Sequence, residues 1–328
     1  MRGSTVVLAT ALAVAPGCNQ LFGLDPPRGR DAQGGDVDAP ADAPADAPTD
    51  GACLGDRDCD GVVDATDNCP DVPNRLQRDF DGDGDGDLCD LCPAVGNDTT
   101  VNNSDGDGVG DACDFSPGLE CVVWFDTFRD PSGLTSYRTT TAGPWSITGD
   151  ALVQDSASLA DEVLWTQATY VAPTVATGGK ILVALPSAVD GGPAADQYSV
   201  EVAPVAANAA SDLAGSVIGY LHANPAAQTT VLGLASAGQS GATAPVAAPL
   251  GVAMQPFSLA ASITLAHAQL STVRATAMGA PSRPGGPLPV ALRTRYLSVR
   301  FDYLLITDVD PVNCPTAGGC HCPPPPEL

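Results

Sequence analysis

The sequence predicts a mainly β protein, in which an antiparallel β-sandwich follows cysteine-stapled loops of little regular structure and a disordered N-terminal tether. Three observations support this fold class: apolar and polar residues alternate over residues 118–313, aspartates recur at fixed spacing over 53–117, and 18–52 is rich in Ala, Asp and Pro. The charge divides similarly, because 23 acidic and 3 basic residues between Asp31 and Asp114 supply 20 of the 25 net negative charges. So dense a negative charge repels phosphates, and we expect no nucleic-acid partner.

The first residues have the pattern of a targeting segment. Arg2 precedes the apolar run Val6–Val14, which is too short to span a bilayer, and Ala15-Pro16-Gly17-Cys18 follows. A small residue before cysteine resembles the lipobox of bacterial lipoproteins. The resemblance implies a signal peptide over 1–17, a lipid on Cys18 as membrane anchor, and a place at the outer membrane or cell surface. Secretion without lipid, with Cys18 oxidised elsewhere, stays open.

Residues 18–52 are expected to form the tether. The Asp-Ala-Pro near-repeats between Asp38 and Pro48 offer almost no apolar side chain to bury, so this segment gains little by folding. Its prolines and the mutual repulsion of its carboxylates favour a semi-extended chain.

Three aspartate runs within residues 53–117 share one register. Each has oxygen-bearing side chains at positions 1, 3, 5, 9 and 12 and glycine at position 6, and the runs start 23 and 24 residues apart. Alternate carboxylates on a tightly curled loop converge on one ion, the glycine permits the curl, and position 7 adds a backbone carbonyl, as calcium requires. We therefore predict Ca²⁺ as the bound ion. The predicted ligands are Asp56, Asp58, Asp60, Val62, Asp64 and Asp67 in the first loop, Asp79, Asp81, Asp83, Asp85, Asp87 and Asp90 in the second, and Asn103, Asp105, Asp107, Val109, Asp111 and Asp114 in the third.

The flanks of these loops decide between two kinds of calcium loop. EF-hands carry Glu at position 12 and a helix on each side, whereas position 12 is Asp in all three runs and the flanks hold Cys and Pro. The flanks resemble thrombospondin type 3 repeats, which implies successive calcium loops without helices, joined by disulfides. The residues that carry the resemblance are Asp67-Asn68-Cys69-Pro70, Val72-Pro73-Asn74, Gln77, Gly86-Asp87-Leu88-Cys89-Asp90 and Gly110-Asp111-Ala112-Cys113-Asp114. The departures from the family pattern are Leu91, Asn103, Cys53 and Cys59.

Eleven cysteines favour an oxidising compartment, where they form disulfides. Following the resemblance, Thr66 and Ser116 stand where further repeat cysteines would be, which leaves two pairs within the array. These pairs are Cys69 with Cys89 and Cys92 with Cys113, and Cys53 with Cys59 is the expected local third bridge.

The head, residues 118–313, has the period-two pattern of strands. Tyr198, Val200 and Val202 alternate with polar neighbours, as do Leu297, Val299, Phe301 and Tyr303, and a turn is expected near His267 to Gln269. Trp124-Phe125-Asp126, the stretch from Trp145 to Leu152 and the closing run Val299–Tyr303 resemble concanavalin A-like lectin/glucanase jelly rolls. This implies a jelly-roll sandwich with its ends close together. A Cys121–Cys314 bridge would join them, and the residues 314–328 form a Cys/Pro-rich tail in which a Cys320–Cys322 bridge stays open.

The chemistry of the head favours binding over catalysis. The glucanase branch carries Glu-x-Asp-x-Glu on one strand, and here Glu162 and Glu201 each lack an acidic partner two residues away, so we expect no enzyme. Cys320-His321-Cys322 is one ligand short of a closed zinc site. We therefore expect a calcium-binding, lipid-anchored surface protein whose calcium-dependent spacer presents a head for adhesion or for binding a glycan or surface protein. A structural envelope protein without ligand, and a polysaccharide hydrolase, are the alternatives.

Overall fold

The structure is a computed structural model of the 328-residue chain. It describes residues 53–96, 103–114, 119–139, 145–155, 162–184, 198–206, 213, 215–224, 229–236, 241–248, 250, 254–279, 281, 286–309 and 322–325. The signal peptide, Cys18 and the tether lie outside the described residues. No helix in the described ranges is long and apolar enough to cross a membrane.

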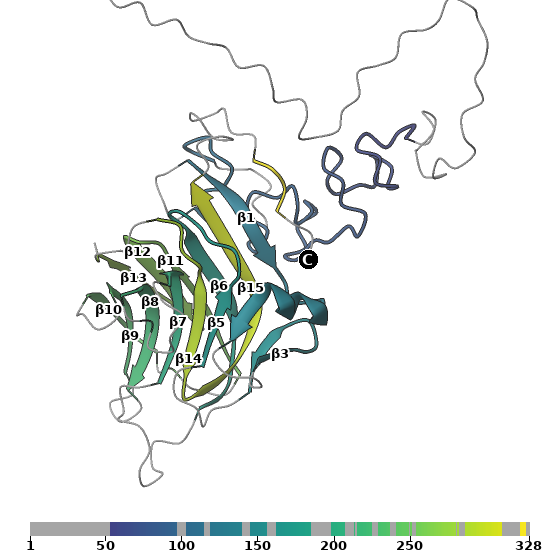
Figure 1. Ribbon diagram of the computed structural model, residues 1–328. Coiled ribbons are helices and arrows are strands. Elements are labelled where there is room, and N and C mark those ends of the chain that lie inside the picture. The colour runs from purple at the N-terminus through teal and green to yellow at the C-terminus, as the bar shows by residue number, and fades with distance from the viewer. Residues whose placement is uncertain are drawn as a thin grey trace, which may run out of the picture. The chain divides into compact units, whose positions relative to one another are not determined.

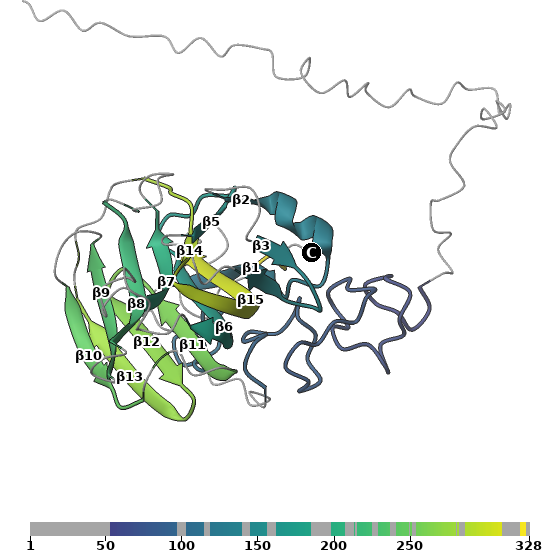
Figure 2. The ribbon, with the colours of Figure 1, turned by 90° about the horizontal axis from the view of Figure 1, so that it is seen from below.

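The head is an antiparallel β-sandwich, as the sequence predicts (Figures 1 and 2). One sheet, here the β15 sheet, runs in the order β13 (Val273–Met278), β12 (Leu265–Leu270), β11 (Gln255–Ala261), β6 (Thr174–Ala184), β15 (Leu297–Val309), β4 (Leu152–Gln154) and β3 (Trp145–Ile147), and β1 (Glu120–Asp126) also pairs with β15. The other, the β7 sheet, runs in the order β10 (Ala242–Val246), β9 (Thr229–Ser236), β8 (Val217–Asn224), β7 (Tyr198–Val205), β14 (Ala291–Arg295), β5 (Glu162–Thr166) and β2 (Tyr137–Thr139). The 3-10 helix η1 (Pro131–Ser136) follows β1.

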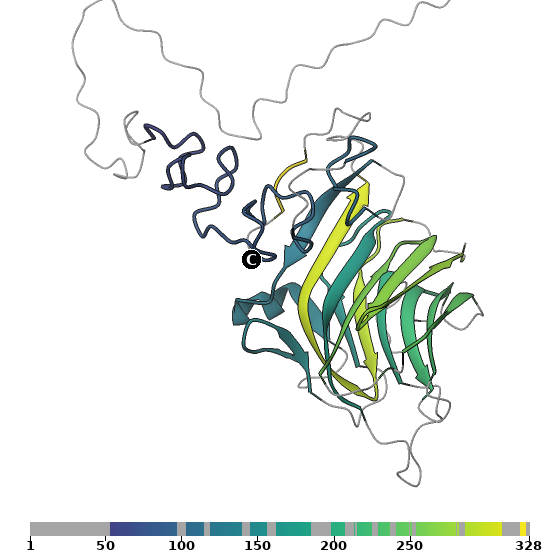
Figure 3. The same ribbon diagram turned by 180° about the vertical axis from the view of Figure 1, so that it is seen from behind.

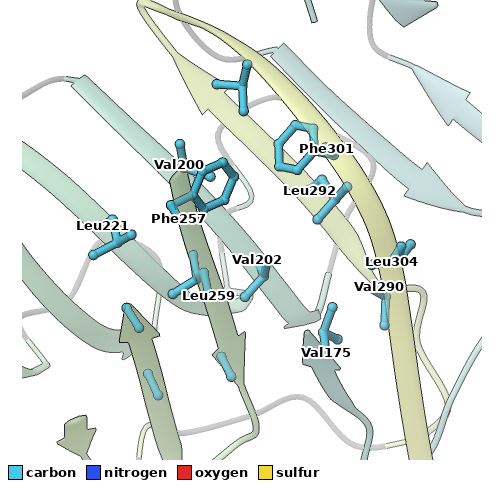
Figure 4. Close-up of a cluster of buried hydrophobic side chains, with 14 of the residues drawn as sticks. Val175, Val200, Val202, Leu221, Phe257, Leu259, Val290, Leu292, Phe301 and Leu304 are labelled. Carbon is cyan, nitrogen blue, oxygen red and sulfur yellow. The ribbon is translucent and has the colours of Figure 1, made fainter. Parts of the chain in front are cut away.

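The core fills the space between the two sheets. Val200 and Val202 of β7 face Phe257 and Leu259 of β11 and Phe301 of β15, all nearly or completely buried (Figure 4). Because successive side chains of a strand point to opposite faces, the period-two pattern places these residues on the inner faces. Each such buried side chain contributes roughly 1.5–3 kcal/mol to folding.

Strand β15 lies between β1 and β6 (Figure 3), and the alternation of inner and outer side chains is interrupted at one point along it. A β-bulge between Phe301 and Tyr303 shifts the register, so Leu304 and Ile306 continue the inner face and Tyr303 turns to the outer face. The expectation that Tyr303 shares the face of Phe301 is therefore wrong, because one extra residue reverses every side chain that follows. The glycines opposite allow this course: a Cβ on Gly178 would lie 2.8 Å from the Tyr303 ring.

The turn expected near His267 to Gln269 is also misplaced. The chain turns at residues 262–264 and again at 271–272, on either side of β12. In the first turn the Ser262 hydroxyl accepts the N–H groups of Thr264 and Leu265 at 3.2 Å. His267 and Gln269 therefore lie within strand β12 and point out from the sheet. The hydroxyl of Ser262 stabilises a turn that the weak alternation of this segment does not reveal.

Disulfides join the repeats as expected, but the fourth bridge differs. The three repeat bridges are Cys53–Cys59, Cys69–Cys89 and Cys92–Cys113. Cys121 pairs with Cys322 rather than with Cys314, across a Cα–Cα distance of 5.5 Å. Cys314 lies outside the described residues, and the pairing excludes a Cys320–Cys322 bridge. The C-terminal tail therefore returns to the first strand of the head, beside the third loop, where the Cys322 sulfur adjoins Gly108.

Candidate metal centres and their junction with the sandwich

The three aspartate loops fold with the same internal hydrogen bonds. At 2.7 Å, the position-9 carboxylate accepts the N–H of position 2, in the pairs Asp64 with Arg57, Asp87 with Phe80 and Asp111 with Ser104. The position-5 carboxylate accepts the N–H of position 7 at 2.7–3.0 Å, in the pairs Asp60 with Val62, Asp83 with Asp85 and Asp107 with Val109. The repeat seen in the sequence is therefore also a repeat of conformation.

Each loop gathers three carboxylates. Oxygens within 4.8 Å of one another come from positions 1, 3 and 5 of the first two loops and from positions 3, 5 and 12 of the third. The residues are Asp56, Asp58 and Asp60, then Asp79, Asp81 and Asp83, then Asp105, Asp107 and Asp114. At position 1 of the third loop, the side-chain oxygen of Asn103 accepts the N–H of Gly106 at 2.7 Å, as that of Asp79 does from Gly82.

The predicted ligands at position 9, and at position 12 of the first two loops, lie outside the three clusters. The position-9 residues Asp64, Asp87 and Asp111 are not among these close oxygens, because their carboxylates bind the position-2 N–H groups instead. At position 12 of the first two loops, Asp67 and Asp90 each accept the N–H of the cysteine two residues on, at 2.8 and 2.7 Å. Each of these two carboxylates has a second oxygen beyond the one that accepts this bond.

Several carboxylate oxygens in the first two loops are buried and make no hydrogen bond within the described chain. They are Asp56 Oδ1, Asp58 Oδ2, Asp67 Oδ2 and Asp81 Oδ2. Asp56 as a whole is 7% exposed. A buried carboxylate oxygen without a partner is costly, and a cation in contact with it would remove that cost. The donor set, which is oxygen only and negatively charged, fits a hard divalent cation.

Burial and mutual repulsion destabilise the charged forms of these groups. Burial, followed by repulsion from Asp83 and Asp79, raises the pKa of Asp81. Burial, together with repulsion from Asp81, Asp83 and Asp85, raises the pKa of Asp90 to about 7. The second loop therefore concentrates negative charge that a bound cation would stabilise.

The glycine at position 6 serves two different purposes. Gly61 and Gly84 have φ angles of 101° and 108°, where a side chain would be strained, so they permit the curl of the first two loops. Gly108 of the third loop is needed for space instead. A Cβ there would lie 2.0 Å from the Cys322 sulfur and 3.1 Å from the Glu120 carbonyl oxygen.

The third loop is bonded directly to the first strand of the head. The Glu120 N–H donates to Asp107 Oδ2, and the Gly108 N–H donates to the Glu120 carbonyl, both at 2.8 Å. Gly108 and Cys121 form an isolated parallel β-bridge. One candidate metal ligand, Asp107, therefore also holds β1 in place.

An apolar contact extends this junction to the second loop. Phe80 lies edge-on to the rings of Phe125 and Tyr303, with centroids 5.8 and 5.6 Å away. Val109 and the Cys92–Cys113 bridge bury against the same outer face of the β15 sheet. The second and third loops thus cover part of the head.

A groove begins where this cover ends, and its polar residues were not foreseen as a site. Its volume is about 410 Å³. Ala94, Val95 and Ala112 of the repeats line one side, and the other side is the outer face of β6, β11, β12 and β13. His267 and Gln269 lie on one face of β12, where the sequence predicts a turn, and this difference explains why the groove was not predicted.

The outer face of the β7 sheet holds a closed charge network. Glu201, 1% exposed, accepts from Arg293 Nε at 2.8 Å and also from Ser199 and His222. Burial alone would raise the pKa of Glu201, but Arg293, His222 and Ser199 lower it to about 2. This carboxylate is ionised and fully engaged.

Comparisons with known proteins find solved structures that match part of the chain at low identity. No family model and no curated protein matches the sequence. A Bacillus subtilis protein of unknown function with a galectin-like fold is 11% identical, with TM-score 0.41, over 58% of this chain and 97% of its own. A Bacillus licheniformis β-glucanase is 9% identical, with TM-score 0.38, over 56% of this chain and 96% of its own. The carbohydrate-binding module CBM66 from Bacillus subtilis is 12% identical, with TM-score 0.34, over 51% and 91%. Each match is a likeness of fold alone.

Proposed function

We propose that the protein binds calcium through its three aspartate loops. The observation that carries this is the set of three carboxylate clusters, in which buried oxygens of Asp56, Asp58 and Asp81 have no hydrogen-bond partner. Calcium takes six to eight oxygens in flexible geometry, which suits loops that offer carboxylates and carbonyls. The resemblance of residues 53–117 to thrombospondin type 3 repeats supports the same ion.

Calcium would act here as a structural ion. It would neutralise carboxylates that otherwise repel one another in a region with little apolar core, as metals do in other small domains. In the second and third loops it would also fix Phe80 and Asp107, which contact the head. The proposed role is thus a calcium-dependent spacer that also braces the head.

Calorimetric titration of the oxidised chain with calcium tests this proposal. Replacing Asp81 and Asp83 with Asn should lower the number of ions bound, because both carboxylates belong to the second cluster. The control is Asp85→Asn, which removes one negative charge from a side chain outside the cluster and leaves its backbone carbonyl in place. An unchanged ion count in the double variant would refute the assignment of the second loop.

We infer that the head binds a ligand, for adhesion or glycan recognition, and is not a hydrolase. Retaining and inverting glycosidases need two carboxyl groups across the scissile bond, one of them able to protonate the leaving group. Glu201 is ionised and held by Arg293, which does not suit it to that role. Release of reducing sugar from a panel of polysaccharides, abolished by Glu201→Gln, would contradict this inference.

We further propose that Cys18 carries a lipid that holds the protein at the outer membrane or cell surface. The support is the Gly17-Cys18 step after a short apolar run, in residues outside those that the structure describes. Metabolic labelling with palmitate tests it. The wild-type protein should be labelled and Cys18→Ala should not. If the wild type is also unlabelled, the predicted lipid anchor is wrong.

A further inference from the structure

We propose that the groove between the repeats and the outer face of the β15 sheet binds a neutral carbohydrate, and that it does so only when the loops hold calcium. The proposal rests on the calcium binding and ligand-binding head inferred above, and adds the place, the chemical class and the regulation. The groove's volume of about 410 Å³ lies within the roughly 300–1,000 Å³ usual for ligand pockets.

The floor of the groove is two rows of residues that run across neighbouring strands. In the first row, Tyr303 lies opposite Gly178, which is followed by Ser258, Gln269 and Arg274. In the second row, Ala176 is followed by Ala260, His267 and Thr276. The rows are apolar or aromatic on β15 and β6 and become polar on β12 and β13.

The polar ends of the rows are held in place by each other. Arg274 Nε donates to Gln269 Oε1 at 3.0 Å, and the Thr276 hydroxyl is bonded to His267 Nδ1 at 2.8 Å. Within the described chain, the terminal nitrogens of Arg274 make no hydrogen bond, and Arg274 and Thr276 are exposed. These side chains are therefore preorganised donors and acceptors that face solvent.

The wall of the groove comes from the repeats. Ala94 is half-buried, and Val95, 39% exposed, and Ala112 are the apolar groups at the edge of the cover. An apolar wall beside a floor of hydroxyl, amide and imidazole groups suits a sugar ring, which presents C–H groups on its face and hydroxyls at its rim.

The charges favour a neutral sugar. Among the described residues that line the groove, none is a carboxylate and Arg274 is the one cationic side chain. Burial lowers the pKa of His267 and so favours its neutral form. The stretch Asp56–Asp114, which includes the wall, has 17 acidic and 3 basic residues, and this negative charge repels a polyanion. The hydroxyls of a neutral sugar can accept hydrogen bonds from Arg274 and bond the amide of Gln269 without this electrostatic repulsion.

Calcium dependence follows from what holds the wall. Residues 94–96 pack against the second loop, because a Cβ on Gly96 would lie 3.1 Å from the Asp81 carbonyl oxygen. Ala112 lies within the third loop, between Asp111 and Cys113. Two candidate calcium loops thus set the position of the wall, whereas the sheet sets the floor.

The test is a panel of neutral hexasaccharides, namely glucans, xylan, mannan and galactan, probed with the full oxidised chain, followed by calorimetry on the best binder. The same preparation is titrated with calcium. We expect at least one neutral glycan to bind in calcium. Arg274→Ala and Thr276→Val should each weaken that binding at least 10-fold, and chelation should do the same. The matched control is Met278→Thr, on the same strand and face, 75% exposed and outside the groove.

The outcomes separate the two proposals. Calcium binding with a blank neutral panel overturns the groove inference alone, as does a preference for acidic glycans or for peptides. Glycan binding that Arg274→Ala leaves unchanged places the ligand elsewhere and also overturns it. Binding that is lost in Arg274→Ala but unaffected by chelation, in a sample that does bind calcium, overturns the calcium dependence. Absence of calcium binding refutes the function proposed above and the calcium dependence together, and the Arg274→Ala result then decides the groove by itself.

Discussion

Replacing Asp107 with Asn should destabilise the head as well as the third loop. Asp107 is 6% exposed, and its two oxygens accept the N–H groups of Val109 and Glu120, both at 2.8 Å. Asn keeps the shape but offers one accepting oxygen and no charge, which costs about 1.5–3 kcal/mol for a buried charge-assisted hydrogen bond. Loss of the loop's calcium removes ~2.7 kcal/mol more at a 100-fold excess over its Kd.

The assay is thermal unfolding of the oxidised chain, followed by near-ultraviolet circular dichroism, with calcium and with chelator. For a domain of this size, each kcal/mol shifts Tm by roughly 2–4 °C, so the two losses together should lower the Tm of Asp107→Asn in calcium by about 8–23 °C. The matched control is Asp105→Asn, whose carboxylate accepts only the Asp107 N–H and does not contact the head. In chelator, Asp105→Asn should melt with the wild type and Asp107→Asn below both. Identical curves for the two variants in chelator would refute a link from the loop to β1.

Three further outcomes follow from the contacts. Gly108→Ala should prevent the third loop from closing on the Cys121–Cys322 bridge, because the added Cβ would meet the Cys322 sulfur. Thiol titration of this variant should then find free cysteine. A fully oxidised variant with the Tm of the wild type would contradict this. Phe301→Ala should lower the unfolding free energy by about 3–5 kcal/mol in urea denaturation, since Phe301 is fully buried between the sheets, and a loss under ~1 kcal/mol would mean that the core is misassigned. Since the folded-state pKa of Glu201 is depressed from 4.5 to about 2, its ionic contribution is present above about pH 4.5 and is lost as the pH falls toward 2. Urea denaturation at a series of pH values should show this loss in the wild type and less of it in Arg293→Met; an equal acid loss in both would remove Arg293 as the cause.

The sandwich could be predicted because most of its strands bury one face. In β7 and β11, Val200, Val202, Phe257 and Leu259 alternate with their neighbours and all enter the core. The bulge in β15 could not be predicted, since the run Leu304-Leu305-Ile306 is apolar at every position and fits either register. The position of Tyr303 depends on that bulge, and so does the contact of the repeats with the head.

The sequence predicted the local part of the candidate metal centres but not their contact with the head. Spacing alone identified the clustered carboxylates at positions 3 and 5, because local geometry brings alternate residues of a curled loop together. It could not identify the junction, which joins residues far apart in sequence, such as Phe80 and Tyr303. One signal was available: position 2 is Phe80 in the second loop, where the other loops have Arg57 and Ser104. A phenylalanine among aspartates would be exposed on an isolated loop, and this indicates a contact surface.

The two outer faces of the sandwich differ in what their polar groups leave for a ligand. On the β7 sheet, Glu201 and Arg293 are nearly buried and bind each other, and a ligand there would have to break a desolvated ion pair, at a cost of several kcal/mol. On the β15 sheet, Arg274 holds Gln269 through Nε alone and turns its other nitrogens to solvent. A ligand on that face gains hydrogen bonds without breaking any ion pair. We therefore propose recognition beside the repeats, where the same loops that would bind calcium form the wall of the groove.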